Sequence, residues 1–305
     1  MSLKNALRVG PSEIEIAYEE FGEADAPPVL LIMGAGAQML SWHEGFCAEL
    51  VSHGLRAIRF DNRDTGLSTH FPDAPEPDFQ AALSGDTSSV SYDLSDMAAD
   101  TVGLLDALEL ESAHLVGASM GGFIAQMIAI EYPDRVRSIT SMMATTGNPS
   151  VGQPAPDTLR LLGGPPPNTR EEAMEQAVRN FRVVGSPGFT LDENDVRERA
   201  GLAFDRSFDR PGMMRQAIAV IASGDRTSRL RSIKVPTLVI HGDSDRMCDV
   251  SGGIATAEAI KGAKLVVIEG MGHNFPRPLW PRLASLIADH IQQVELVYSE
   301  ERDNI

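Results

Sequence analysis

The sequence predicts an α/β fold in which helices cover both faces of a mostly parallel sheet. Segments that indicate strands recur along the chain at 28–32, 56–60, 113–116, 136–143, 236–240 and 264–268, and they are most nearly apolar throughout at 28–32, 113–116 and 264–268. Uninterrupted apolar runs of this length are typical of parallel strands that are buried on both faces. The chain has 305 residues and 43% hydrophobic content, which is enough for the core of one large domain.

The first part of the chain shows the elements that accompany these strands. Residues 13–21 alternate and predict an early strand, and an apolar stripe along 42–50 predicts a helix. Asp93 and Asp96 open an amphipathic helix. Before this helix, residues 71–91 form a long aperiodic segment rich in Pro, Asp and Ser, which predicts a loop. Loops of that length are often functional, so we expect this one to border the site entrance.

After the strand at 136–143, the alternation of helices and strands stops until Val235. The intervening segment is rich in Pro and Gly and then shows helical patterns around 170–184, 192–208 and 211–223. We therefore predict a core of residues 1–147 and 232–305 with a helical cap inserted at 148–231. Candidates for lining a pocket under the cap are Met174, Phe181, Phe189, Phe204, Phe208, Met213 and Met214. A capped apolar pocket favours a bulky, largely hydrophobic substrate.

A Gly-x-Ser-x-Gly pattern stands between the strand at 113–116 and a following apolar helix. Its residues are Gly117, Ser119 and Gly121. A sharp strand-to-helix turn strains the central residue and leaves no room for side chains two positions away, which the glycines satisfy. The helix also directs its N-terminal amides and positive dipole end toward the serine. The pattern predicts Ser119 as a nucleophile.

A serine nucleophile needs a base to take its proton and an acid to orient that base. Among seven histidines, His273 alone stands in a glycine-rich loop after the last strand, at the edge where ligands bind in open α/β sheets. Two aspartates, Asp243 and Asp245, follow the strand at 236–240 and reach the same edge. A structural aspartate in this turn would cap it through local backbone hydrogen bonds.

The tetrahedral intermediate also needs hydrogen-bond donors for its oxyanion. We assign one donor to the backbone amide of Met120, directly after the nucleophile, and the second to the amide of Ala35, in the glycine-rich loop after the strand at 28–32. The cluster Asp61-Asn62-Arg63-Asp64 is interpreted as hydrogen bonding that fixes a loop under the site.

These motifs together resemble the α/β-hydrolases, specifically the group that includes aclacinomycin methylesterase. The segments that carry the resemblance are Leu31-Ile32-Met33-Gly34, the stretch from Arg59 to Ser68, Gly117 to Gly122, and Gly270-Met271-Gly272-His273. The resemblance implies ester hydrolysis with Ser119 as nucleophile and His273 as base. It favours Asp245 as the acid, because the family places that residue three positions after a glycine, here Gly242, and leaves Asp243 as the alternative.

The chain departs from the family pattern at two places. Met33 replaces the histidine of the common His-Gly oxyanion motif, a change that this group shares, and Arg246-Met247-Cys248 follows the acid where relatives usually carry proline and aliphatic residues. The first departure leaves the backbone donor in place. The second concerns the shape and polarity of the pocket.

The amino-acid composition limits the kinds of partner that the protein can bind. The net charge of −17 argues against nonspecific binding to nucleic acid or anionic membranes, which both reward positive charge. Two cysteines are too few for a disulfide framework, and neither an apolar signal segment nor a membrane-spanning stretch is visible, so we expect a cytoplasmic protein. We expect a small-molecule ester as substrate, and a reaction that uses neither a metal nor another cofactor.

Two other functions use the same residues. A haloperoxidase-like perhydrolase without cofactor, or an acyltransferase, would pass the acyl group to peroxide, alcohol or thiol instead of water. A small-ligand receptor with this fold would turn over slowly or not at all. A carboxylate in place of Ser119 would indicate an epoxide hydrolase or dehalogenase, and the serine disfavours both.

Overall fold

The computed structural model describes residues 2–303, so residue 1 and residues 304–305 of the expected core lie outside the described residues. One eight-stranded sheet has the order β1-β2-β4-β3-β5-β6-β7-β8. The strands are β1 (Lys4–Val9), β2 (Ile14–Phe21), β3 (Pro28–Ile32), β4 (Arg56–Phe60), β5 (Ala113–Ala118), β6 (Val136–Met142), β7 (Thr237–Gly242) and β8 (Lys264–Ile268). β1 and β2 pair antiparallel, as do β2 and β4, and all other pairs are parallel.

Helices cover both faces of this sheet. The core helices are α1 (Glu44–Ser52), α3 (Leu94–Ala107), α4 (Met120–Glu131), α9 (Thr227–Leu230), α10 (Ser251–Ala259) and α11 (Trp280–Asp303). Leu30 and Ile32 of β3 pack in a cluster with α3 and α4, whereas Val29 and Leu31 pack in a second cluster with α1 and α11. Because successive side chains of a strand point to opposite faces, burial on both faces explains the uninterrupted apolar run in β3.

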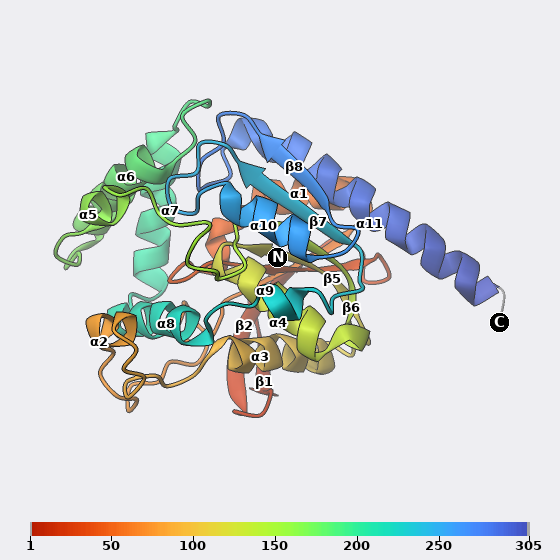
Figure 1. Ribbon diagram of the computed structural model, residues 1–305, viewed down its shortest axis with the longest axis horizontal. Coiled ribbons are helices and arrows are strands. Elements are labelled where there is room, and N and C mark those ends of the chain that lie inside the picture. The colour runs from red at the N-terminus through yellow and green to blue at the C-terminus, as the bar shows by residue number, and fades with distance from the viewer. Residues whose placement is uncertain (1, 304–305) are drawn as a thin grey trace.

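Five helices lie between β6 and β7, within the range where the cap is expected. One of them is α9, which packs against α4 and α10 of the core. Four others precede it. They are α5 (Thr158–Leu162), α6 (Arg170–Val184), α7 (Glu193–Arg206) and α8 (Arg210–Ser223). Figure 1 shows them together at one side of the sheet. Side-chain caps fix the starts of the last three, since Thr169, Asp192 and Asp209 each accept a hydrogen bond from a backbone amide of the first turn.

The loop expected at 71–91 is not entirely aperiodic. It contains the short helix α2 (Phe79–Leu83), which Asp78 caps by accepting from the amide of Ala81. α2 packs against α8. One turn of helix is too short to produce an apolar period, so the sequence pattern did not predict it.

Candidate active site

Ser119 sits at the turn between β5 and α4 in a backbone conformation that is rare for a side-chain-bearing residue, with φ 55° and ψ −121°. The neighbouring chain leaves no room beside it. A Cβ on Gly117 would lie 2.1 Å from the carbonyl oxygen of Gly121, and a Cβ on Gly121 would lie 2.0 Å from that of Ile32. These contacts involve backbone atoms that cannot swing away, so the two glycines are required for the turn.

His273 pairs with Asp245. Its Nδ1 lies 2.7 Å from Oδ2 of Asp245, whose side chain is fully buried. The other carboxylate oxygen accepts the backbone amides of Met247 and Cys248, at 2.9 and 2.8 Å. These bonds fix the carboxylate, and the pairing at Nδ1 leaves Nε2 of the imidazole as the nitrogen that can exchange a proton with another group.

Asp243 has different partners. It accepts the backbone amide of Gly270 at 2.8 Å and the hydroxyl of Ser244 at 2.8 Å, and it is exposed. It therefore ties the end of β7 to the loop that precedes His273. This is the local capping role that an aspartate in such a turn can serve.

Ser119 and His273 line one cavity of about 330 Å³, together with Ala35 from the loop after β3 and Phe181 and Val184 from α6. Within the described residues, the hydroxyl of Ser119 makes no hydrogen bond to the imidazole within 3.5 Å. Such contacts are often long in ligand-free enzymes and tighten when substrate binds.

The two expected oxyanion donors lie beside this cavity. Met120 is the first residue of α4, and Ala35 lines the cavity directly. In the described part of the chain neither amide donates a hydrogen bond to the protein, so both are available to a ligand. Gly34 approaches the nucleophile closely, since a Cβ there would lie 3.1 Å from Cβ of Ser119.

Gln216 of α8 holds the loop that carries Ala35. Its Oε1 accepts the amide of Gly36 at 2.7 Å, and its Nε2 donates to the carbonyl oxygen of Arg63 at 2.6 Å and to Oγ1 of Thr65 at 2.7 Å. The side chain is completely buried. No motif in the sequence marks this glutamine, because its partners are about 150 to 180 residues away.

The acidic cluster after β4 makes hydrogen bonds that fix its loop and extend to helices α7 and α8. Asp61 accepts the amides of Met39 and Leu67 at 2.7 and 3.0 Å and pairs with Arg206 of α7 at 3.0 Å. Asp64 accepts two hydrogen bonds from Arg215 of α8, at 2.8 and 2.9 Å.

The buried Asp64 stays charged in this setting. Burial acts to raise the pKa of its carboxyl, but hydrogen bonds from Arg215 and from the Tyr92 hydroxyl, 2.7 Å away, outweigh it and hold that pKa below its usual range. Asp64, His70 and Asp209 place atoms of the kind that bind metal ions within 4.8 Å of one another. Because both oxygens of Asp64 already bind Arg215, this group forms an ion-pair network between the loop after β4 and helix α8.

Most of the expected cap residues line cavities, but they are divided among several cavities. Phe181 lines the cavity of Ser119, and Phe204, Phe208, Met213 and Met214 line a neighbouring cavity described below. Phe189 lines a separate pocket with α6 and α7. Met174 packs within the helices, where its sulfur accepts a hydrogen bond from Arg170 at 3.2 Å. Arg199, which no pattern singled out, reaches the Ser119 cavity and pairs with Asp195 at 2.8 Å.

Residues 27–276 match the family described as alpha/beta hydrolase fold. The chain belongs to this family. The match and the parallel sheet with helices on both faces confirm the predicted fold class.

The relatives of this α/β-hydrolase include two methylesterases. It is 30% identical over 299 residues to rhodomycin D methylesterase DauP of Streptomyces sp. strain C5, with 91% of this chain and 95% of that protein covered. It is equally similar, at 30% over 300 residues and the same coverage, to rhodomycin D methylesterase DnrP of Streptomyces peucetius. These matches confirm the predicted resemblance to the methylesterase group.

A solved structure supports the fold alone. A mutant of the meta-cleavage product hydrolase CumD of Pseudomonas fluorescens IP01, complexed with acetates, superposes with a TM-score of 0.72 at 20% identity, covering 95% of this chain and 97% of that one. In the described residues of this hydrolase, no helix combines the length and the apolar character needed to cross a membrane.

Proposed function

We propose that the protein is a serine hydrolase that cleaves a carboxylic ester through an acyl-enzyme. The observation that carries the proposal is the 2.7 Å contact of His273 with the buried Asp245, because His273 lines the same cavity as Ser119 at its strained turn. The methylesterase relatives support the same reaction class.

In this mechanism the hydroxyl of Ser119 attacks the ester carbonyl carbon while Nε2 of His273 takes the hydroxyl proton. Asp245 accepts the hydrogen bond from Nδ1 and stabilises the imidazolium that forms. The bond between the former carbonyl carbon and the alcohol oxygen breaks as His273 returns the proton to that oxygen. Water then repeats the attack on the acyl-enzyme, with His273 acting as base, and releases the acid and the free serine.

The charge on the tetrahedral oxygen is stabilised by the amides of Ala35 and Met120 in this scheme. Removing one such donor costs about 2.7–4 kcal/mol in measured enzymes. The N-terminal end of α4 points at Ser119 and adds a favourable dipole. The glycines at 117 and 121 serve by permitting the turn that presents the serine.

The proposed substrate is a methyl ester or lactone of a bulky hydrophobic compound. The relatives include two methylesterases, and aromatic and aliphatic side chains such as Phe181 and Val184 line the Ser119 cavity. We propose that residues 148–231 form the cap over it. We also propose a cytoplasmic location, which is supported by two free, buried cysteines, Cys47 and Cys248.

A fluorophosphonate probe tests the nucleophile. The probe should add its mass at Ser119, and Ser119→Ala should abolish both labelling and esterase activity. Ser41→Ala is the matched control, because Ser41 lines the same cavity and its loss should leave labelling of Ser119 intact. Labelling of Ser119→Ala together with retained activity would contradict the proposal.

A further inference from the structure

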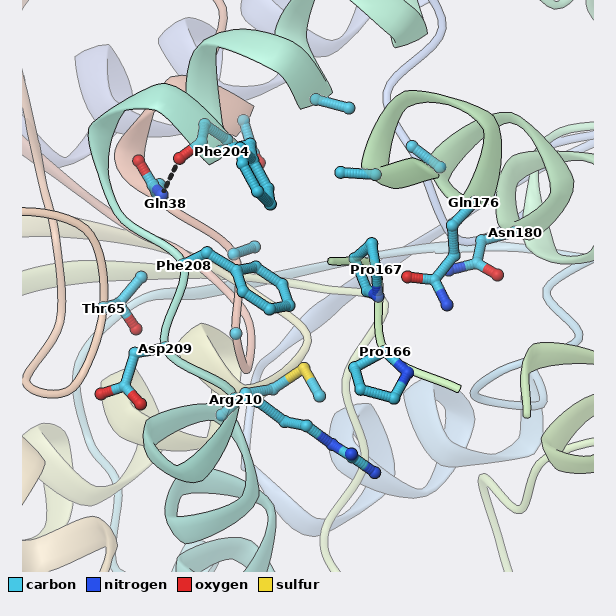
Figure 2. Close-up of a pocket in the computed structure, with 18 of the residues that line it drawn as sticks. Gln38, Thr65, Pro166, Pro167, Gln176, Asn180, Phe204, Phe208, Asp209 and Arg210 are labelled. Atoms are coloured by element: carbon cyan, nitrogen blue, oxygen red, sulfur yellow. Dashed lines mark hydrogen bonds between the residues drawn. The ribbon is translucent and has the colours of Figure 1, made fainter. Parts of the chain in front are cut away.

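A second cavity of about 450 Å³ lies next to the Ser119 cavity, between the cap helices and the core loops that contain Gln38 and Thr65 (Figure 2). We refer to it as the cap cavity. The residues that line both cavities are Ala37, Ser41, Leu162, Asn180, Phe181 and Arg199. The two spaces therefore meet along a boundary made by both core and cap residues, and a ligand at Ser119 can extend into the second space.

The cap cavity exposes apolar surface that a folded protein ordinarily buries. Phe208 is 50% exposed and Met213 is 43% exposed. Phe204 and Phe208 form a tilted aromatic pair with ring centroids 5.5 Å apart, opposite Pro166 and Pro167 of the loop before α6 (Figure 2). Covering such a surface with a ring-containing ligand is favourable, because aromatic faces bury a large apolar area and prefer defined ring geometries.

Polar groups stand on more than one side of this space (Figure 2). On the side of the core loops, Gln38, Thr65 and Asp209 are already hydrogen-bonded within the protein. Gln176 and Asn180 both come from α6 and lie next to each other (Figure 2). Within the described residues, the side-chain amide of Asn180 makes no hydrogen bond to the protein, and Gln176 makes only a long one of 3.4 Å to the carbonyl oxygen of Pro165. An unpaired carboxamide in a largely apolar pocket provides orientation and specificity for a ligand oxygen.

We propose that the cap cavity is a substrate subsite that binds the part of the ester remote from the scissile bond. The ligand class is an extended, ring-containing and largely apolar group that carries an oxygen substituent within reach of Asn180. This inference rests on the proposed function, since it places the ester carbonyl at Ser119.

The subsite is tested by measuring kcat/KM of the wild-type enzyme for two series of esters. One consists of methyl esters of phenylalkanoic acids with growing chains, and the other of phenylalkyl acetates, so that the ring is carried by the acid or by the alcohol. In one series kcat/KM should rise by about fourfold per added methylene that becomes buried, and it should rise further once the ring reaches the cap cavity. A flat or falling kcat/KM in both series overturns the subsite.

The two proposals fail differently in this assay. If even the shortest esters show no turnover that depends on Ser119, the proposed function is wrong. If short esters are hydrolysed and long ones gain nothing, the function stands and only the subsite is wrong.

A filled cavity supplies the second test. Ala173 lines the cap cavity but not the Ser119 cavity, so Ala173→Trp should fill the former. The ratio of kcat/KM for the long ester to that for the short ester should then fall toward one. Glu171→Trp is the matched control, because Glu171 lies exposed on the same helix, and it should keep the wild-type ratio. Equal ratios in both folded variants overturn the subsite.

The role of Asn180 has its own measurement. A keto-substituted ring should be preferred over the plain ring, and Asn180→Leu should reduce that preference by about two- to tenfold, as expected for loss of one hydrogen bond. An unchanged preference in a folded Asn180→Leu enzyme would remove the hydrogen bond from the proposal.

Discussion

Gln216→Leu tests whether a cap residue sets the position of the proposed oxyanion loop. The leucine keeps the approximate volume but removes the acceptor for the Gly36 amide and the donor for Arg63 and Thr65. All three hydrogen bonds are 2.6 to 2.7 Å long and involve a fully buried side chain. The amide of Ala35 immediately precedes that of Gly36, so loss of this anchor affects the donor next to it.

Two separate costs follow from these contacts. A buried polar group left without a partner costs about 1–3 kcal/mol, so the free energy of unfolding should fall by several kcal/mol. Complete loss of one oxyanion donor would lower kcat by about 100- to 1,000-fold. Because Gln216 acts on Ala35 through the loop, we expect part of that loss, about ten- to 100-fold in kcat. KM should change little, since the oxyanion forms only in the transition state.

The assay measures kcat, KM and urea unfolding for a short p-nitrophenyl ester. Gln126→Leu is the matched control, because Gln126 is also completely buried and hydrogen-bonded, with Nε2 3.4 Å from the carbonyl oxygen of Thr145. That variant should lose stability and keep kcat. A folded Gln216→Leu enzyme with wild-type kcat, or equal kcat losses in both variants, would refute the role assigned to Gln216.

Three further predictions concern the acid, the turn and pH. Asp245→Asn should lower kcat by up to about 10⁴-fold, as the same change in the triad of a serine protease does, and Asp243→Asn should lower it far less. Steady-state kinetics measures both, and the reverse order would assign the acid to Asp243. Gly121→Ala should reduce the yield of folded protein and its Tm, because its Cβ would overlap a backbone oxygen; a wild-type Tm would contradict the turn geometry. Burial acts to lower the pKa of His70, but hydrogen bonds to the Gly66 carbonyl and a carboxylate hold it above the usual value. His70 should therefore stabilise the fold fully below about pH 6.5, and this contribution should vanish as pH rises through the raised pKa; unfolding of wild type and His70→Gln against pH measures it, and a stability difference that grows with pH would reverse the sign.

The parts of the fold that could be predicted are those with a local cause. The run of β3 is apolar because both of its faces are covered, and the spacing of Gly117, Ser119 and Gly121 reflects collisions within one turn. The methylesterase relatives agree with the predicted ester hydrolase class. Helix α2 is a single turn, so it carries no period that a sequence pattern can detect.

The parts that could not be predicted depend on long-range contacts. The turn after β7 contains two aspartates, and spacing alone does not say which one faces His273. The outcome depends on how the loop folds, because Asp243 is held by the amide of Gly270 while Asp245 turns inward to the imidazole. Gln216 and Asn180 have no local signature, since their significance comes only from the elements that the fold brings beside them.

The attachment of the cap has a consequence for engineering. Helix α8 is joined to the core through the buried pair of Arg215 with Asp64 and through Gln216, next to the loop of Ala35. Breaking a buried ion pair by removing one partner typically costs about 3–5 kcal/mol, so α8 is a poor place to introduce diversity. Helix α6 presents Ala173 and Ala177 to the cap cavity, and its hydrogen bond to the His273 amide lies at its far end, at Val184. Libraries directed at positions 173 and 177 should therefore change substrate range while retaining turnover, whereas libraries directed at α8 should yield mainly inactive or unstable proteins.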